Sequence, residues 1–176
     1  MLYLANQFLQ CQVISLETLK IIGHINGILV DPYRFEVAGF WIQPYTKNYK
    51  HWPVLLRQSM RQFDDQKVYV NSIHELNSPL DLPKLKQILE EDYQIPDKKI
   101  ISTDQKTLGI AENFSFHSES FKIMHVIMKP PIHRRLSKSR QQFERRQIEK
   151  ITPKIIEVNI NPKKQRLQSI PTKLIS

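Results

Sequence analysis

The sequence predicts a mainly β protein that contains two tandem copies of one strand pattern. The first copy covers residues 13–42 and the second covers residues 100–128. Each copy holds a β-branched run, a polar turn, a glycine, an alternating apolar stretch, a tight turn and a further strand-forming run. Gly23 of the first copy falls on Gly109 of the second, and from there the two copies stay in register without a gap. A repeat of this length corresponds to a whole small domain.

The pattern within each copy is typical of a bent antiparallel meander. Along residues 21–30 of the first copy, odd-numbered side chains are expected on one face of the strand and even-numbered ones on the other. The shared glycine stands where a curved sheet needs a kink. We therefore predict that Gly23 and Gly109 occupy equivalent backbone positions with no room for a side chain.

Three stretches carry a pattern that is found in a known family. They are residues 23–32, residues 108–123 and residues 146–158. In these stretches the sequence resembles the PRC-barrel family, the small β-barrels found in the cytoplasmic part of the photosynthetic reaction-centre H subunit and at the C-terminus of RimM-type ribosome-maturation factors. That family usually has a glycine after the second turn, whereas in this sequence the phenylalanines Phe35 and Phe121 follow the turns.

The resemblance implies two tandem small PRC-like β-barrels joined by a short helix, and it implies no catalytic residue. We place the first barrel at residues 1–80, a helical linker at residues 81–98, the second barrel at residues 99–161 and a basic C-terminal tail at residues 162–176. Each barrel alone would bury only a small core. We therefore expect the two barrels to pack together and to depend on each other for stability.

The linker is the stretch with the clearest signals of a helix, which we expect over residues 81–91. Asp81 can cap its start, and Pro83 suits a first-turn position. An apolar stripe follows, formed by Leu82, Leu85, Ile88 and Leu89. Because this stripe must be buried, the linker is expected to pack against one or both barrels.

Cys11 is the only cysteine of the chain, and it lies among apolar residues. An internal disulfide and a cysteine metal cluster are therefore excluded, and a buried structural thiol is expected. The chain contains no run of about 18 consecutive apolar residues. Its N-terminus lacks the basic start and the cleavage site of a signal peptide. These features favour a cytoplasmic protein.

Positive charge is concentrated in the last quarter of the chain. The formal net charge is +9. Residues 1–130 carry 14 basic and 14 acidic side chains, whereas residues 131–176 carry 12 basic and 3 acidic ones. An anionic partner is therefore expected to bind to the last quarter.

Two regions supply candidate residues for binding a protein partner or RNA. The loop at residues 44–53 mixes aromatic and basic side chains, which can stack on bases, anchor a protein partner or fold back over the barrel. Its candidates are Tyr45, Tyr49 and Trp52. The basic loop at residues 129–145 and the following basic positions can contact phosphate or remain solvated. Their candidates are Arg134, Arg135, Lys138, Arg140, Arg145, Arg146, Lys163, Lys164 and Arg166.

The sequence contains no motif of catalysis. With four glycines it has neither a phosphate-binding loop nor a dinucleotide fingerprint, and neither G-x-S-x-G nor H-E-x-x-H occurs. The six histidines are scattered along the chain. We therefore expect no enzyme activity, no metal site, no cofactor and no small-molecule substrate.

Three functional classes remain. The resemblance implies a non-enzymatic adaptor that docks onto a larger protein assembly. The basic quarter and the aromatic loop motivate an alternative, a ribosome-associated or RNA-associated maturation factor whose partner is ribosomal RNA or a ribosomal protein. A further alternative is an adaptor at a membrane surface, because a basic segment can also bind anionic lipid.

Overall fold

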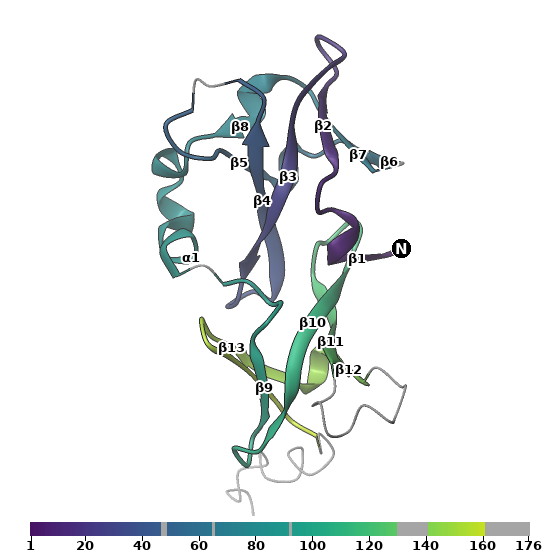
Figure 1. The fold of residues 1–176 in the computed structure, drawn as a ribbon, viewed down its shortest axis with the longest axis vertical. Helices are drawn as coiled ribbons and strands as arrows, with labels where there is room; N and C mark the ends of the chain where they lie inside the picture. Colours follow the sequence, from purple (N-terminus) through teal and green to yellow (C-terminus); the bar gives the residue numbers. More distant parts are fainter. Residues whose placement is uncertain (47–48, 65, 92, 130–140, 161–176) are drawn as a thin grey trace, which may run out of the picture.

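The computed structural model describes residues 1–46, 49–64, 66–91, 93–129 and 141–160. Most of the regular structure in these residues is β, arranged as two seven-stranded sheets that follow one another along the long axis of the molecule (Figure 1). A mainly β fold is therefore confirmed. No helix in the described ranges is long and apolar enough to cross a lipid bilayer.

The first sheet has the strand order β6-β7-β2-β3-β4-β5-β8. Its strands are β2 (Gln12–Ser15), β3 (Lys20–Asp31), β4 (Glu36–Pro44), β5 (Val54–Leu56), β6 (Gln62–Asp64), β7 (Lys67–Val70) and β8 (Leu76–Asn77). The second sheet has the order β12-β11-β10-β9-β14-β13, and β1 pairs with β10 beside this path. Its strands are β1 (Leu2–Leu4), β9 (Lys99–Ser102), β10 (Thr107–His117), β11 (Ile123–Lys129), β12 (Gln141–Glu144), β13 (Ile148–Ile151) and β14 (Ile155–Val158).

The two sheets repeat the same path apart from β8 and β1. In both, a long central strand, β3 or β10, pairs antiparallel with the next strand along the chain. In both, the strand before it pairs in parallel with the last strand of the repeat, so that Val13 lies opposite Val68 and Ile100 lies opposite Ile156. Residues 21–30 and 108–116 are strands, as the sequence predicts. The repeat therefore extends well beyond the stretches in which the sequence shows it.

Neither sheet closes into a barrel, which corrects the closed form expected from the resemblance. In the described residues the end strands β6 and β8 of the first sheet do not pair with each other, and neither do β12 and β13 of the second. In the first sheet the two-residue strand β8 pairs with β5 at the end of the path. Each sheet is therefore open and has shorter strands on both sides of one long strand.

The expected alternation of faces along β3 holds only over residues 23–26. The pairing of β3 with β4 shifts between Ile25 and Gly27 and again between Leu29 and Val30. The four consecutive residues 28–31 are all buried. Such bulges bend a strand and increase its twist, and for that reason they change which side chains face the core.

The kink glycines Gly23 and Gly109 occupy equivalent places, as predicted. A methyl group built on Gly23 would lie 2.6 Å from the carbonyl oxygen of Gln43. One built on Gly109 would lie 2.7 Å from the carbonyl oxygen of Lys129, the equivalent residue of the second repeat. Both positions lack room for a side chain.

The linker is less helical than the sequence predicts. It consists of two 3₁₀ turns, η4 (Pro79–Asp81) and η5 (Pro83–Leu85), followed by the helix α1 (Lys86–Glu91). Two prolines remove backbone donors from the first turns, and Ser78 rather than Asp81 caps the start, because its hydroxyl accepts a hydrogen bond from the Leu80 N–H at 3.3 Å. Ile88 is buried and Leu85 packs against the core. The expected packing of the linker is therefore confirmed.

The N-terminal strand crosses from the first repeat to the second. β1 pairs antiparallel with β10, with Leu2 opposite His117 and Leu4 opposite Ser115. Figure 1 shows β1 lying beside the upper end of β10. The residues that precede the first repeat are therefore part of the second sheet.

An aromatic cluster around Phe8 joins the two repeats. The Phe8 ring is fully buried, and its centroid lies 4.2 Å from that of Phe63 and 5.4 Å from that of Phe40, both of the first sheet. It lies 5.3 Å from the ring of Phe116 on β10. The buried apolar side chains form a single cluster that runs through both repeats. The expectation that the repeats pack together is therefore confirmed.

The hairpin turns of the two repeats bind each other through reciprocal backbone hydrogen bonds. The Val37 N–H donates to the Phe121 carbonyl oxygen, and the equivalent Ile123 N–H donates to the Phe35 carbonyl oxygen, both at 2.8 Å. Phe35 and Phe121 have φ values of 52° and 57°. This left-handed conformation is the one that glycine favours. Phenylalanine therefore adopts the glycine-like conformation at the point where the two repeats meet.

Cys11 is a buried thiol, as predicted. Its side chain is 1% exposed and donates a hydrogen bond to the Gln7 carbonyl oxygen at 2.9 Å. Burial raises the pKa of the Cys11 thiol to about 11. The thiol therefore stays protonated near neutral pH.

Candidate functional site

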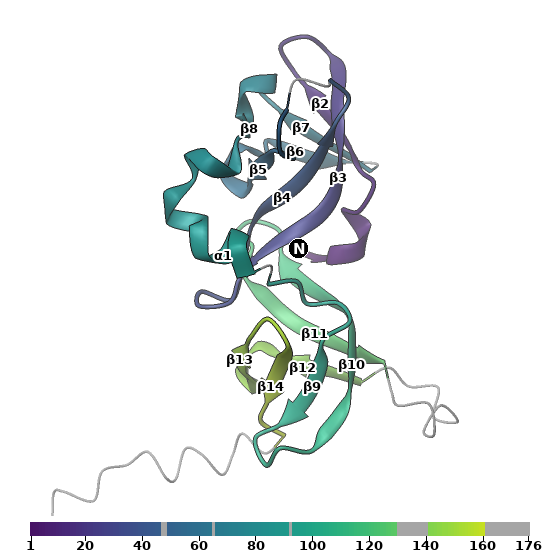
Figure 2. The ribbon, with the colours of Figure 1, turned by 60° about the vertical axis from the view of Figure 1, so that its left-hand side comes forward.

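An open groove of about 620 Å³ lies between the first sheet and the linker. Aromatic side chains from β4 and from the loop before β5 form one wall, and the linker forms the other. Figure 2 shows α1 and the turns before it beside the strands of the first sheet. The lining residues are Trp41, His51, Trp52, Pro79, Leu80, Leu82, Pro83, Lys86, Leu89 and Glu90.

The sheet positions the two tryptophans. Trp41 on β4 lies opposite Gly27 on β3, and a methyl group built on Gly27 would lie 3.3 Å from Trp41 Cδ1. The missing side chain of Gly27 therefore leaves space for the Trp41 indole. Trp41 also pairs with Val54, the first residue of β5, and Trp52 lies two residues before it. Strand β4 thus holds Trp41, and the loop before β5 brings Trp52 to the same groove.

The linker supplies the apolar residues of the opposite wall. The η4 turn places Leu80 at the surface, where its side chain is 78% exposed. Leu82 and Leu89 are partly buried against the core. Ile88, buried on the other side of α1, anchors this wall to the protein. An exposed leucine beside an exposed tryptophan is costly in water and is typical of a contact surface.

The indoles of the groove have no partners within the described ranges. Trp52 is 47% exposed, and neither Trp52 nor Trp41 stacks on another ring or donates its N–H to a hydrogen bond there. Lys86 and Glu90 form an ion pair at 3.8 Å. The groove is therefore lined mainly by apolar and aromatic side chains, with one exposed ion pair among its lining residues.

The three aromatic residues predicted for binding lie in different places. Trp52 lines the groove. Tyr49 packs partly buried against the core, and burial raises the pKa of its phenol. Tyr45 is exposed, and its ring lies beside that of His24, with the centroids 5.8 Å apart. The loop therefore folds back over the sheet at Tyr49 and contributes Trp52 to a surface.

Most of the predicted basic residues lie outside the described residues. These are Arg134, Arg135, Lys138, Arg140, Lys163, Lys164 and Arg166. Arg146 is exposed and pairs with Glu144 at 2.7 Å. Arg145 lies with its guanidinium 3.6 Å from the centre of the Phe35 ring, and desolvation by burial lowers its pKa. Arg145 therefore contacts the turn of the first repeat.

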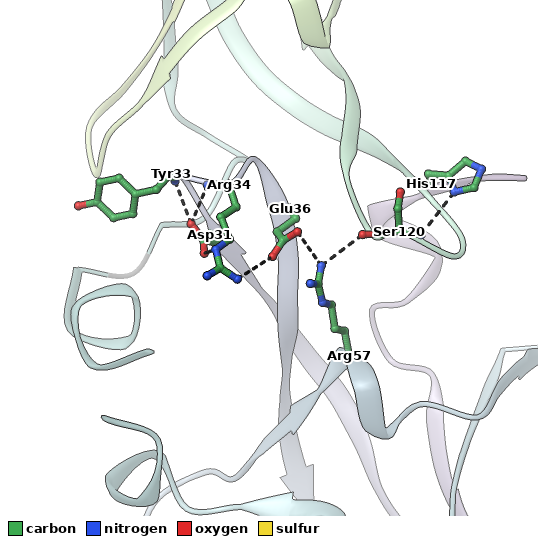
Figure 3. Close-up of polar contacts among 7 residues, drawn as sticks. All are labelled: Asp31, Tyr33, Arg34, Glu36, Arg57, His117 and Ser120. Carbon is green, nitrogen blue, oxygen red and sulfur yellow. Dashed lines mark hydrogen bonds and ion pairs between the residues drawn. The ribbon is translucent and has the colours of Figure 1, made fainter. Parts of the chain in front are cut away.

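A second cleft, of about 450 Å³, lies beside a network of charged residues at the junction between the repeats. The Asp31 carboxylate accepts hydrogen bonds from the backbone N–H groups of Tyr33 and Arg34, both at 2.9 Å (Figure 3). In the second repeat, His117 has the equivalent role, because its Nδ1 accepts from the N–H groups of Glu119 and Ser120 at 3.4 Å.

Arg57 connects this network to the second repeat. Its Nη1 lies 2.8 Å from a carboxylate oxygen of Glu36 and donates to the Ser120 carbonyl oxygen at 3.2 Å (Figure 3). Arg57 begins the turn η2 (Arg57–Ser59), and Arg145 begins the equivalent turn η7 (Arg145–Gln147). Equivalent arginines thus reach from each repeat to the hairpin turn of the other. Both carboxylates of the network have cationic partners, so we interpret it as a structural junction.

Replacing Arg57 by alanine is expected to lower the free energy of unfolding by about 1–2 kcal/mol. The substitution leaves the Glu36 carboxylate, whose side chain is 10% exposed, with only Arg34 at 3.9 Å. It also leaves the Ser120 carbonyl without this donor. Urea denaturation followed by circular dichroism measures the change.

The matched control is Arg146→Ala, which removes an exposed ion pair and should cost under about 1 kcal/mol. Equal losses for the two variants would contradict a structural role for Arg57.

The described residues contain no group of three or more histidine, cysteine, aspartate or glutamate side chains that could hold a metal ion.

Among the residues that line the groove, the sequence predicted Trp52 as a binding residue but not Trp41, Leu80 or Leu89. The signal that could have indicated Trp41 was the pairing of a glycine with a tryptophan on adjacent predicted strands.

Comparison with protein-family models finds none that matches the chain, and comparison with curated proteins finds no match either.

Proposed function

We propose that this protein is a non-enzymatic adaptor with two PRC-like repeats, which docks onto a larger protein assembly through the groove between β4, β5 and the linker. One observation carries the proposal. Two indoles without ring or hydrogen-bond partners in the described residues lie opposite an exposed leucine. Tryptophan in an apolar pocket is the residue type that contributes most often to binding energy at protein interfaces.

The fold supports the PRC-like part of the proposal. Both sheets share one strand order, and both have a kink glycine whose position is closed by the facing strand. We infer that each repeat is an opened variant of the small barrel, joined to its neighbour by the hairpin turns. Joined in this way, the two repeats form a rigid support for a docking surface.

The charge of the groove favours a protein partner over RNA. Stacking on nucleic acid requires cations that neutralise the adjoining phosphates. In the groove, the Lys86 ammonium is already paired with Glu90. The remaining lining residues are apolar or aromatic apart from His51. An uncharged protein surface is therefore the more complementary partner.

Purification of tagged variants from the native host tests the proposal. The variant Trp52→Ala with Leu80→Ala removes both exposed apolar groups, so we expect recovery of the co-purifying partner protein to fall at least about tenfold. The control Leu19→Ala with Ile110→Ala removes side chains with the same exposed fractions, 78% and 47%, outside the groove and should retain the partner.

Nuclease treatment separates the alternatives in the same purification. An adaptor retains its protein partner after ribonuclease, and its recovery depends on Trp52 and Leu80. Recovery that survives the groove variant would contradict docking through the groove. Recovery that is lost with ribonuclease would contradict direct protein docking and would favour the RNA-associated alternative.

A further inference from the structure

We propose that the groove binds a proline-rich segment of the partner protein in the polyproline II conformation. This inference rests on the proposed adaptor function and adds the chemistry of the partner. Proline-rich segments bind to aromatic-lined grooves, where their preformed conformation keeps the entropic cost of ordering low. Here Trp41, His51 and Trp52 form an aromatic wall, and Leu80 and Leu82 face it from the linker.

The hydrogen-bonding groups of the groove match such a segment. Within the described residues neither indole N–H has an acceptor, and Glu90, the carboxylate among the lining residues, lies 3.8 Å from Lys86 in an exposed ion pair. Apart from Lys86, Glu90 and His51, the lining side chains therefore carry two donors and no acceptor. A polyproline II segment presents solvated carbonyl acceptors, and each proline lacks an N–H that would need an acceptor. The indole donors of the groove therefore match the carbonyl acceptors of the segment.

Other secondary structures of the partner fit less well. A helix uses its carbonyl groups internally, so it would leave the indole N–H groups unpaired. A partner strand would need a sheet edge, and the nearest one is β8, which has two residues. Pro79 follows that strand after Ser78 and cannot donate to a ladder. An extended segment without backbone donors is therefore the best match.

Charge restricts the composition of the segment. The Lys86–Glu90 pair leaves no unbalanced charge on the rim apart from any carried by His51. A strongly acidic or basic segment would lose its hydration without gaining a partner. The centre of the bound segment is therefore uncharged.

Intrinsic fluorescence provides a direct test, because the only two tryptophans of the chain both line the groove. Three probes are titrated into the full-length protein. They are a twelve-residue peptide of repeated Ala-Pro-Pro, an uncharged leucine-rich peptide that forms a helix, and a twelve-nucleotide oligouridylate. We expect a saturable change in emission with the proline peptide and at least tenfold weaker binding of the other two.

The variant Trp52→Phe tests the hydrogen-bond part of the proposal, because it keeps an aromatic ring and removes the indole N–H. We expect it to bind the proline peptide at least fivefold more weakly, with Trp41 as the remaining reporter. The control Tyr45→Phe changes an exposed aromatic residue outside the groove and should bind as the wild type does.

The outcomes separate this inference from the adaptor function. Preferential binding of the helical peptide overturns the proline-rich partner and leaves a protein-docking groove. Binding of oligouridylate alone overturns both. If no probe changes the emission, the proline-rich partner is wrong, and the dependence of partner recovery on Trp52 and Leu80 decides the adaptor function. Unchanged affinity in Trp52→Phe also overturns the proposed recognition by the indole donor.

Discussion

Cleavage of the chain between Leu89 and Lys98 is expected to leave neither repeat stably folded under conditions in which the intact chain is fully folded. The cut separates β1 from its only described pairing partner, β10. It also makes the two hydrogen bonds between the hairpin turns intermolecular. Each fragment would then expose the surface that the other covers.

The energetic scale of this loss is set by the aromatic cluster. Phe8 is fully buried against rings of both repeats. Losing the packing around one such ring costs about 3–5 kcal/mol. A typical domain has a total stability of about 5–15 kcal/mol, and each repeat has less core than the whole chain. The loss at the junction is therefore comparable to the whole stability of a fragment.

The experiment uses a protease site inserted between Leu89 and Lys98. Uncut protein with the same insertion is the control, because it carries the change in sequence without the break. Thermal unfolding is followed by circular dichroism for the uncut protein, for each purified fragment and for the two fragments mixed. We expect a cooperative transition in the uncut protein, its loss in each fragment and partial recovery on mixing. A fragment that melts at the temperature of the uncut protein would show that the repeats are independent.

Features that depend on local pattern could be predicted from the sequence. Strands 21–30 and 108–116 follow from runs of β-branched and apolar residues, and the kink glycines follow from the register of the repeat. The buried thiol of Cys11 follows from its apolar neighbours. For the strands and for Cys11 the signal lies within a few residues of the feature, and for the kink glycines it lies in the match between the two copies.

Features that depend on contacts between distant segments could not be predicted. β1 is only three residues long, so its pairing with β10 has no periodic signal in the sequence. β8, at the end of the first sheet, has only two residues, and no pattern marks so short a strand. The apolar stripe predicted a helix over residues 81–91, whereas Pro79 and Pro83 begin the two 3₁₀ turns η4 and η5.

The hairpin turn of each repeat has a phenylalanine in a backbone conformation that glycine favours. Phe35 and Phe121 both adopt positive φ, at a cost of about 1–2 kcal/mol for a non-glycine residue. Each carbonyl oxygen accepts a hydrogen bond from the other repeat. Phe121 also stacks on Phe116, with centroids 5.7 Å apart. Glycine could accept the same backbone hydrogen bonds but could not make this ring contact, which stabilises the turn against the backbone strain.

Only part of the candidate site could be predicted from the sequence. Trp52 stands out because it lies in a loop of aromatic and basic residues, and it does line the groove. Trp41 lies in the last strand-forming run of the first copy, where no motif marks it, and Leu80 precedes the predicted helix. Their contribution depends on the linker folding back beside β4 and β5, and no local pattern specifies that arrangement.

Replacing Gly23 by alanine is expected to cost about 3 kcal/mol of unfolding free energy, because the added methyl group overpacks a closed site. It would lie 2.6 Å from the Gln43 carbonyl oxygen and 2.9 Å from Ile42 Cγ2. The first of these atoms belongs to the backbone of β4, so relief requires the two strands to move apart and weakens their hydrogen bonds. Gly109→Ala meets the Lys129 carbonyl oxygen at 2.7 Å and should show a similar loss.

Gly27→Ala is the matched control on the same strand, because its methyl group meets only Trp41 side-chain atoms, the nearest at 3.3 Å. A side-chain neighbour can shift by a few tenths of an ångström, and alanine restores part of the strand propensity that glycine lacks, so we expect a change within about 1 kcal/mol of zero. Urea denaturation of the three variants measures the differences. Gly23 and Gly109 meet equivalent carbonyl groups, so a large loss of stability in one variant with none in the other would show that the kink differs between the two repeats. A loss in Gly27→Ala as large as that in Gly23→Ala would contradict the steric explanation.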